Sequence, residues 1–517
     1  MENAVKYPVG VQSFEVLRNE GFVYVDKTDL VHKLAQQHVC FLCRPRRFGK
    51  SLTLSTLEAY FLGKQELFEG LKIMELEHEW KQYPVFHLDF NGVNFSEPNA
   101  LSNRLLSSVF EWENEYQIQA KSKNIGDRLA YVLEQAHAQT GERCVVLIDE
   151  YDKPMLDVLG ESQEQTNRDI LKGFYSVFKL ADADLRFVML TGVTKFSQVS
   201  VFSGFNQPLD ISMSSEFEAI CGITEDELTE YFSEPIASMA SDSGMSVEET
   251  RYWMKTYYDG YHFSDSLTDI YNPFSLLNAF FNKSMRPYWF GSGTPTYLIK
   301  LMESNNVDIQ TLLSKEYAPE YFVDYRANRE DPLAMLYQSG YLTIKEVHRI
   351  GIDKSYRLDF PNVEVKRGFV SLLYNTYFDN KDFSSSTMRQ MVQSLEEGDL
   401  ELFRKTLTVY LSSIDYAMRK DKEYHFQYTL YLIFSLMSTY NVKVERHTSQ
   451  GRSDMIVETK DHVYVFEFKL DGSASEAMQQ IDETGYALPY LTGNRVVHKI
   501  GVSFGKKSGT IDEWIVA

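Results

Sequence analysis

The sequence has no long apolar stretch: none of its 517 residues lies in a run approaching the roughly 18 consecutive apolar residues of a membrane-spanning helix. The first residues, MENAVKYPVG, contain neither the basic segment nor the apolar core that directs secretion. We therefore expect a cytoplasmic protein that does not enter a membrane.

Cysteine is scarce, with four residues in the chain. Cys40 and Cys43 form a CxxC pattern, but on a strand an offset of three points the two side chains to opposite faces. The remaining cysteines, Cys144 and Cys221, do not form a second pair that could complete a metal site. We expect buried thiols at these positions rather than a metal or redox centre.

Basic residues are outnumbered, with 52 Lys and Arg against 73 Asp and Glu and a formal net charge of -21. This acidity argues against a protein that coats nucleic acid over its whole surface, although it leaves room for a local basic groove. Internal repeats and low-complexity segments are also missing. The length exceeds what one hydrophobic core supports, so we expect about two to four domains.

Residues 39–61, VCFLCRPRRFGKSLTLSTLEAYF, join a short apolar run, a basic turn and a segment with helical periodicity. A strand, a glycine-containing loop and a helix in this order predict a phosphate-binding loop. Gly49 lets backbone N–H groups approach a phosphate, Lys50 reaches phosphate oxygens, and Ser51 can bind Mg²⁺. Arg44 occupies the place of the first glycine in the pattern G-x-x-x-x-G-K-[ST], so an ordinary basic loop is the alternative.

Residues 144–152, CVVLIDEYD, predict a strand that is buried on both faces and ends in two adjacent acids. At a nucleotide site, Asp149 would hold Mg²⁺ and Glu150 would polarise the attacking water. An exposed acidic turn after a core strand is the alternative. The presence of the loop at residues 39–61 favours the nucleotide site.

Two further apolar segments, 83–90 and 186–196, complete the candidate core strands. The second ends in a polar cluster, where Thr191 or Thr194 would lie beside the γ-phosphate as a sensor; a simple strand-end cap is the alternative. The order of loop strand, extra strand, acidic strand and sensor strand matches the additional-strand class of P-loop NTPases. We predict an α/β fold with a parallel, doubly wound sheet.

The segments around these strands carry less specific patterns. Residues 6–38 precede the first core strand, where nucleotide-binding ATPases often place a base-contacting segment; a packed N-terminal strap fits equally well. Residues 221–295 predict a helical lid whose first helix has Thr224 as N-cap and Glu227 three residues later. The aromatic clusters of the lid indicate core packing. Residues 296–385 fit a connector, for which a winged-helix-like fold is one interpretation.

The last predicted domain, residues 386–517, contains a β-hairpin that carries charged residues. SDMIVET at 453–459 and HVYVFEFKL at 462–470 are its predicted strands. The second strand contains Glu467 and Lys469, which share one face because they are two residues apart.

Charges on an otherwise apolar hairpin need a metal ion or each other to offset their desolvation. Asp454, in the first strand, and Glu467 supply oxygen ligands for Mg²⁺ or Mn²⁺, and Lys469 can orient or deprotonate a metal-bound water. This arrangement predicts a metal-dependent phosphodiesterase. An exposed hairpin face with an ordinary Glu–Lys pair is the alternative.

Two helical segments flank the hairpin. DKEYHFQYTLYLIFSL carries Glu423, a third carboxylate, and has an apolar face that would pack on the hairpin. EAMQQIDETGYALPY predicts a second helix that carries Gln480 and Tyr486. The resulting order, helix with Glu, strand with Asp, strand with Glu-x-Lys and helix with Gln, favours a nuclease site.

Taken together, the motifs resemble those of one family. RPRRFGKSLTLSTLEAYF, LIDEYDKP, LTGVTKFSQVSVFSGFN, YYDGYHF, YNPFSLL and FEFKL are similar to motifs of bacterial proteins that join an AAA-ATPase-like domain to a C-terminal PD-(D/E)XK nuclease superfamily domain. The resemblance covers essentially the full length, and the missing first glycine of the loop is that family's own pattern. It implies a P-loop domain at residues 1–220 and a restriction-endonuclease-like α/β domain at residues 386–517.

The resemblance also implies site residues by position. For nucleotide binding it implies Gly49, Lys50, Ser51, Asp149 and Glu150. For the nuclease core it implies Asp454, Glu467, Lys469, Gln480 and Glu423. Leu52, which follows Ser51, and Thr191 are expected among the nucleotide contacts.

We predict an ATPase unit that controls a metal-dependent nuclease acting on DNA or RNA, with ATP and Mg²⁺ or Mn²⁺ as cofactors. Arg46 or Arg47 contacts phosphate or acts across an interface in a homo-oligomer, or else keeps the loop soluble. One alternative is a non-catalytic nucleotide switch whose C-terminal domain docks a partner. Another is a solitary ATPase that retains the C-terminal fold for assembly.

Overall fold

The computed structural model describes residues 5–196, 208–290, 309–323, 332–378, 385–412, 422–440, 443–449, 452–470, 472–505 and 510–517. The chain forms two compact units, Met1–Val365 and Lys366–Ala517. The predicted domain boundaries near residues 220, 295 and 385 divide the chain more finely than this, and they stay predictions.

A parallel five-stranded sheet in the order β2-β3-β4-β1-β5 forms the framework of the first unit. Its strands are β1 Val39–Cys43, β2 Val85–Asp89, β3 Cys144–Asp149, β4 Leu185–Gly192 and β5 Leu209–Asp210. β1 and β3 are buried along their whole length, as their continuous apolar sequences require. β4 separates them, so the strand that ends in acids is not adjacent to the strand that enters the loop. The predicted parallel, doubly wound fold is confirmed.

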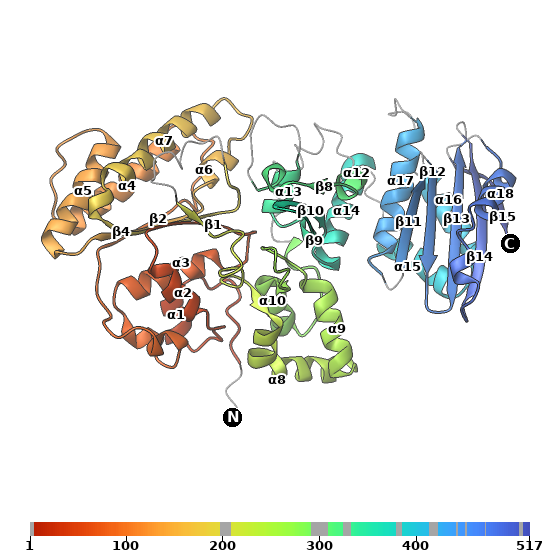
Figure 1. Ribbon diagram of the computed structural model, residues 1–517, viewed down its shortest axis with the longest axis horizontal. Helices are drawn as coiled ribbons and strands as arrows, with labels where there is room; N and C mark the ends of the chain where they lie inside the picture. The colour runs from red at the N-terminus through yellow and green to blue at the C-terminus, as the bar shows by residue number, and fades with distance from the viewer. Residues whose placement is uncertain are drawn as a thin grey trace. The chain divides into compact units, whose positions relative to one another are not determined.

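Helices cover both faces of this sheet (Figure 1). One face carries α1 Phe14–Asn19, α2 Thr28–Ala35 and α3 Lys50–Phe61, and the other carries α4 Ala100–Glu115, α5 Ile125–Thr140, α6 Lys153–Leu156 and α7 Glu164–Leu180. The short 3₁₀ helices of the unit are η1 Gln65–Phe68, η2 Lys72–Glu75, η3 Asp182–Asp184 and η6 Pro319–Tyr321. The start of α3 and the end of β3 lie at the carboxyl ends of the strands, where doubly wound sheets bind their ligands.

A helical subdomain follows the sheet. It contains α8 Glu225–Ser243, α9 Val247–Tyr258 and α10 Pro273–Asn282, with the two-stranded pair β6 Ile223–Thr224 and β7 Ile270–Tyr271. The predicted start of α8 is confirmed, because Thr224 and Glu227 form a complete capping box. The aromatic residues do pack as a core, in a cluster that includes Phe232, Tyr258, Tyr271 and Phe280.

The remaining part of the first unit is a small α/β segment. It comprises α12 Ile309–Leu313, β8 Glu316–Tyr317, α13 Leu333–Gln338, β9 Thr343–Ile350 and β10 Asp353–Asp359. The strands form an antiparallel sheet in the order β8-β10-β9. The winged-helix-like interpretation of this segment stays a prediction.

The second unit is built on a mixed sheet in the order β11-β12-β13-β14-β15. Its strands are β11 Lys443–Ser449, β12 Arg452–Glu458, β13 His462–Leu470, β14 Val496–Phe504 and β15 Ile511–Val516. Its helices are α15 Ser385–Glu396, α16 Leu400–Ser412, α17 Lys422–Met437, α18 Ala474–Thr484 and η8 Leu488–Tyr490, and α14 Val363–Phe378 spans the boundary between the units. β12 and β13 pair antiparallel, which confirms the predicted hairpin. The predicted helix with Gln480 is α18, but it ends at Gly485 in a left-handed C-cap, so Tyr486 lies beyond it.

The two faces of β13 pack against different helices. Phe466 contacts Phe403 of α16 and Phe434 of α17, with ring centroids 5.7 and 5.5 Å apart. The opposite face meets α18, which approaches so closely that a Cβ at Gly501 would lie 2.4 Å from the carbonyl oxygen of Ala474. Glycine in β14 therefore allows α18 to lie over the charged face of the hairpin.

One expectation from composition is met by the structure. Cys40, Cys43, Cys144 and Cys221 are all buried and free, as predicted. Within the described ranges, no helix is both long enough and apolar enough to cross a membrane.

Candidate functional site

The loop between β1 and α3 encloses a buried ammonium group. Gly49 has φ 100°, a left-handed conformation that favours glycine and turns the backbone into the first turn of α3. Lys50 is buried and donates hydrogen bonds to the carbonyl oxygens of Arg44 at 3.0 Å and Pro45 at 3.1 Å. The predicted loop residues Gly49, Lys50, Ser51 and Leu52 all line one cavity.

Arg44, at the position of the missing glycine, turns away from that cavity. Its guanidinium is buried and lies 4.0 Å from the centroid of the Phe263 ring. It donates to the carbonyl oxygens of Cys43 at 2.9 Å, Ser212 at 2.7 Å, and Phe217 and Glu218 at 3.5 Å. Burial lowers the pKa of this group. Arg44 therefore braces the loop against the segment after β5, and its side chain takes no space from the cavity.

The acid at the end of β3 joins residues from three elements. Asp149 accepts a hydrogen bond from the hydroxyl of Ser51 at 2.5 Å through one oxygen and from the hydroxyl of Thr191 at 2.6 Å through the other. The backbone N–H of Glu150 also donates to Asp149, at 3.0 Å. Of the two predicted sensor positions, Thr191 meets the acid, whereas the hydroxyl of Thr194 contacts the sulfur of Met335 at 3.8 Å.

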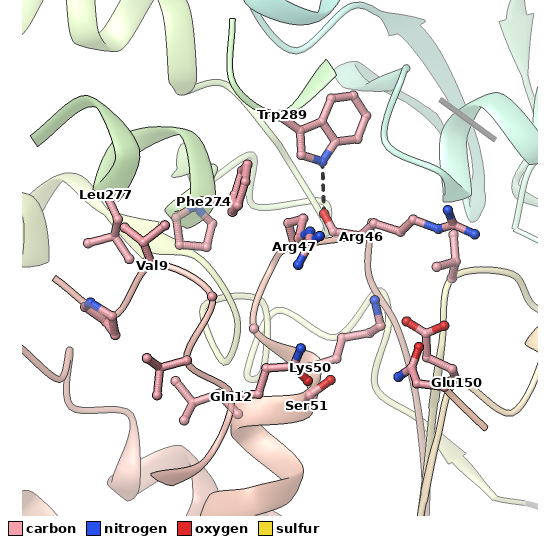
Figure 2. Close-up of a pocket in the computed structure, with 18 of the residues that line it drawn as sticks. Val9, Gln12, Arg46, Arg47, Lys50, Ser51, Glu150, Phe274, Leu277 and Trp289 are labelled. Atoms are coloured by element: carbon pink, nitrogen blue, oxygen red, sulfur yellow. Dashed lines mark hydrogen bonds between the residues drawn. The ribbon is translucent and has the colours of Figure 1, made fainter. Parts of the chain in front are cut away.

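Glu150 stands at a strained corner beside the cavity. Its φ is 49°, a left-handed conformation that is uncommon for a residue other than glycine, and its side chain lines the cavity. A backbone held in this way points the carboxylate away from the strand and toward the loop, as Figure 2 shows.

Asp152 is a buried acid to which the sequence alone assigned no role. It accepts hydrogen bonds from the backbone N–H groups of Val193 at 3.0 Å and Thr194 at 2.6 Å, which ties the turn after β3 to the end of β4. Burial and the neighbouring Glu150 raise the pKa of Asp152 to about 6. The signal was present in the sequence, because the acid follows Asp149 by only three residues in CVVLIDEYD.

The cavity has a volume of about 530 Å³, within the range of roughly 300–1,000 Å³ that small-molecule sites occupy. Its floor is the loop, and one side is formed by Pro8 to Gln12 of the N-terminal segment. Phe274 and Leu277 of α10 form another wall (Figure 2). The N-terminal segment therefore lies beside the cavity. A base-contacting segment, one of the two interpretations of residues 6–38, would lie at this position.

A tryptophan from the end of the helical subdomain completes the wall. The indole Nε1 of Trp289 donates to the carbonyl oxygen of Arg46 at 2.9 Å (Figure 2), and its backbone N–H donates to buried Glu364 at 2.7 Å. Both Arg46 and Arg47 line the cavity, and the Arg47 guanidinium lies 5.2 Å from the centroid of the Phe274 ring. No local pattern could identify Trp289, since its partners lie far away in the sequence.

The second unit places three of the predicted nuclease residues in contact. Lys469 donates to Glu467 Oε1 at 2.8 Å and also to Gln480 Oε1 of α18. Glu467 is fully buried, and among the residues that the structure describes its second oxygen, Oε2, has no hydrogen-bond partner. The β12–β13 register pairs Asp454 with Glu467, and Glu423 falls in the first turn of α17. The side chains of Asp454 and Glu423 lie outside the described residues.

A metal ion suits this carboxylate. Among the residues that the structure describes, no group of three or more His, Cys, Asp or Glu residues is arranged to hold a metal ion. A buried carboxylate oxygen without a partner is costly, however, and a divalent cation is a partner that would satisfy it. The geometry of Glu467, Lys469 and Gln480 therefore fits a site that is completed by a cation.

Both units of the chain are similar to known proteins. Residues 8–202 match the family described as "Predicted AAA-ATPase", and residues 421–514 match the PD-(D/E)XK nuclease superfamily. A protein of Azotobacter chroococcum mcd 1, described as "Uncharacterized protein in vnfD 5'region", is 34% identical over 521 residues. The match covers 99% of this chain and 98% of that protein, so the similarity includes both units.

Proposed function

The chain belongs to the family that joins a predicted AAA-ATPase domain to a PD-(D/E)XK nuclease superfamily domain, and from that membership we propose an ATPase that controls a metal-dependent nuclease. The family assignment supports a nucleotide-binding and nuclease-like protein.

At the first site, ATP would lie in the cavity with its phosphates over the loop. Lys50 would neutralise phosphate charge from within the loop, and Ser51 and Asp149 would hold Mg²⁺, which would supply positive charge for the phosphates. Glu150 polarises the attacking water, and Thr191, near the end of β4, lies beside the γ-phosphate as a sensor. The observation that carries this proposal is the contact of Ser51 and Thr191 with opposite oxygens of Asp149.

At the second site, a nucleic-acid phosphodiester would be hydrolysed beside Glu467. Glu467 and Asp454 would bind Mg²⁺ or Mn²⁺, which supplies a Lewis acid for the phosphate. Lys469 orients or deprotonates the water, Gln480 holds Lys469 in place, and Glu423 is a candidate third carboxylate. The observation that carries this proposal is the unsatisfied Oε2 of buried Glu467 beside Lys469.

ATP binding and hydrolysis by full-length protein test the first site. We expect Lys50→Ala to weaken ATP binding and to lower hydrolysis by about 100-fold or more. Lys64→Ala is the matched control, because Lys64 is a lysine of the same unit that pairs with Glu15 at 2.6 Å. Unchanged hydrolysis in Lys50→Ala would refute the site.

Cleavage of labelled DNA and RNA with Mg²⁺ or Mn²⁺ tests the second site. We expect Lys469→Ala to reduce cleavage by about 100-fold. Lys499→Ala is the control, since Lys499 also contacts α18, through Asp482 at 2.6 Å. If the wild type cuts no nucleic acid with either metal, the non-catalytic switch replaces the nuclease. If Lys469→Ala cuts as well as the wild type, the nuclease site is misassigned.

The arginines of the loop are proposed to contact phosphate or to act across subunits. Mixing Arg46→Ala with Lys50→Ala separates these roles, because an arginine supplied to a neighbouring site restores hydrolysis in mixed oligomers whereas one acting in its own site does not. The same mixture can be made with Arg47→Ala. Restored hydrolysis would establish a homo-oligomer with shared sites.

A further inference from the structure

One buried carboxylate holds two walls of the cavity. Glu364 is 1% exposed, and its two oxygens accept hydrogen bonds from different elements. The hydroxyl of Ser275 in α10 donates to Oε2, and the backbone N–H of Trp289 donates to Oε1, both at 2.7 Å. α10 also supplies Phe274 and Leu277, which line the cavity together with Trp289. A ligand that shifts either wall therefore moves a partner of Glu364.

Glu364 lies in the first turn of α14, and this turn is fixed within the first unit. Asn362 caps the helix, since its side-chain oxygen accepts a hydrogen bond from the backbone N–H of Val365 at 3.1 Å. The amide nitrogen of Asn362 donates to the carbonyl oxygen of Asp259, directly after α9, at 2.9 Å. The helix therefore starts on residues of the unit that contains the cavity.

About one turn later, α14 is attached within the second unit. The Arg367 guanidinium donates through Nε to the hydroxyl of Thr439 at 3.0 Å and through Nη2 to the carbonyl oxygen of Thr439. It also lies 4.4 Å from the centroid of the Tyr440 ring. Because Glu364 and Arg367 are three residues apart, their side chains are neighbours on the surface of the helix. One short stretch of α14 therefore carries contacts of both units.

Arg367 holds the end of a helix that packs on the candidate nuclease strand. Thr439 is buried and lies just after the end of α17. Phe434 of α17 contacts Phe466 of β13, with ring centroids 5.5 Å apart, and Glu467 is the next residue of that strand. A displacement of α17 therefore reaches the strand that carries Glu467 through side-chain packing.

We propose that α14 transmits the nucleotide state of the cavity to the nuclease: Glu364 responds to the cavity walls, and Arg367 passes the resulting shift of the helix to α17. This role rests on the proposed function, because it requires ATP in the cavity. A ligand shifts such an element through its different affinities for two arrangements, and coupling between two sites commonly amounts to about 5-fold to 150-fold. Packed elements move between discrete arrangements, so a small shift at one site is not absorbed on the way to the other.

Hydrogen–deuterium exchange of the full-length protein, with and without Mg²⁺ and the non-hydrolysable ATP analogue AMP-PNP, tests this role without requiring nuclease activity. We expect AMP-PNP to change the exchange rates of backbone amides in residues 429–440 of the wild type by at least about fivefold. Arg367→Ala should show no change in this segment. It should still bind AMP-PNP within about threefold of the wild type in titration calorimetry, since Arg367 is not among the cavity residues.

Arg495→Ala is the matched control. Arg495 is an arginine of the second unit that also has an oxygen partner, Glu458 at 2.7 Å, and a tyrosine ring nearby, with the centroid of Tyr490 at 6.0 Å. Because it does not belong to α14, its loss should leave the effect of AMP-PNP on residues 429–440 as in the wild type.

Cleavage of labelled DNA and RNA gives a second readout. AMP-PNP should change the cleavage rate of the wild type and of Arg495→Ala by at least about fivefold and that of Arg367→Ala by less than about twofold. The rates without nucleotide should be similar in all three proteins. Thr439→Val keeps the shape of the buried side chain but removes the hydroxyl that Arg367 contacts, so it should weaken the coupling. This variant decides the test if Arg367→Ala lowers the unfolding midpoint.

The outcomes separate this role of α14 from the two proposed sites. Coupled exchange that requires Arg367, in a protein that cuts nothing, retains the role of α14 and removes the nuclease. AMP-PNP binding without any change in residues 429–440 or in cleavage overturns the role of α14 and retains the ATP site. Equal coupling in the wild type, Arg367→Ala and Thr439→Val also overturns it. Absence of AMP-PNP binding removes both the ATP site and the role of α14.

Discussion

The indole Nε1 of Trp289 lies 2.9 Å from the carbonyl oxygen of Arg46, although 243 residues separate them in the chain. Trp289 also packs its ring on Tyr341, with centroids 5.3 Å apart. The loop between β1 and α3 is thus shaped in part by a side chain from the end of the helical subdomain.

The first prediction concerns this contact. Trp289→Phe keeps an aromatic ring but removes the donor, and an unsatisfied carbonyl group costs about 1–3 kcal/mol. We expect ATP to bind about threefold to tenfold more weakly, as measured by titration calorimetry. Trp253→Phe on α9, which does not line the cavity, should bind ATP as the wild type does. Equal affinities for the two variants would contradict a positioning role for Trp289.

The second prediction concerns Arg44. Arg44→Gly restores the usual first glycine of the loop but removes a buried guanidinium with four carbonyl partners. We expect the free energy of unfolding to fall by about 3 kcal/mol in urea denaturation, without any gain in ATP affinity. Arg44→Lys should recover little of the loss, because an ammonium cannot reproduce the planar fork. An unchanged free energy of unfolding in Arg44→Gly would show that the hydrogen bonds of Arg44 do not stabilise the fold.

The third prediction is a pH dependence set by Glu364. This carboxyl group accepts hydrogen bonds from the Ser275 hydroxyl and the Trp289 backbone, both at 2.7 Å, and burial raises its pKa to about 7. The folded state therefore holds the proton more tightly than the unfolded state. Its contribution to stability is complete below the ordinary carboxyl pKa of 4.5 and is lost as pH rises through about 7.

Glu364→Gln should remove this dependence. Between pH 5 and pH 7.5 we expect the unfolding free energy of the wild type to fall by about 2 kcal/mol more than that of the variant. Urea denaturation at the two pH values measures the difference. Glu66→Gln is the control, because Glu66 is exposed. Parallel pH profiles for the wild type and Glu364→Gln would contradict the prediction.

The fourth prediction concerns the buried carboxylate of the second unit. Glu467→Gln keeps an acceptor for Lys469 but removes the charge that a metal ion needs. Mn²⁺ should raise the unfolding temperature of the wild type in a concentration-dependent way and leave that of the variant nearly unchanged. Glu458→Gln on β12 of the same hairpin, which alters the ion pair with Arg495 just before β14, should respond as the wild type does. Equal Mn²⁺ responses in all three proteins would remove Glu467 from the metal site.

Much of the candidate site could be predicted because it is encoded locally. In the strand, loop and helix around Gly49 and Lys50, the chemistry follows from residues adjacent in the chain. The same holds for Glu467 and Lys469, whose shared face follows from the period of a strand. Gln480 was expected from its helix, although its contact with Lys469 requires α18 to pack over β13.

The rest could not be predicted because it depends on contacts between distant segments. Arg44 departs from the usual loop pattern, and the contacts that hold its guanidinium come from the distant segment at residues 212–218. Trp289 carries no pattern of its own, and although Asp152 stands in the acidic motif, its partners are backbone groups that only folding brings near.

The sequence by itself determined the parallel sheet, the loop, the acid pair and the charged hairpin, because each depends on the periodicity or spacing of neighbouring residues. Only the tertiary structure decided which threonine meets Asp149, how Arg44 is satisfied and that Trp289 closes the cavity. Burial and hydrogen-bond satisfaction are properties of the packed chain, and a local pattern constrains them only weakly.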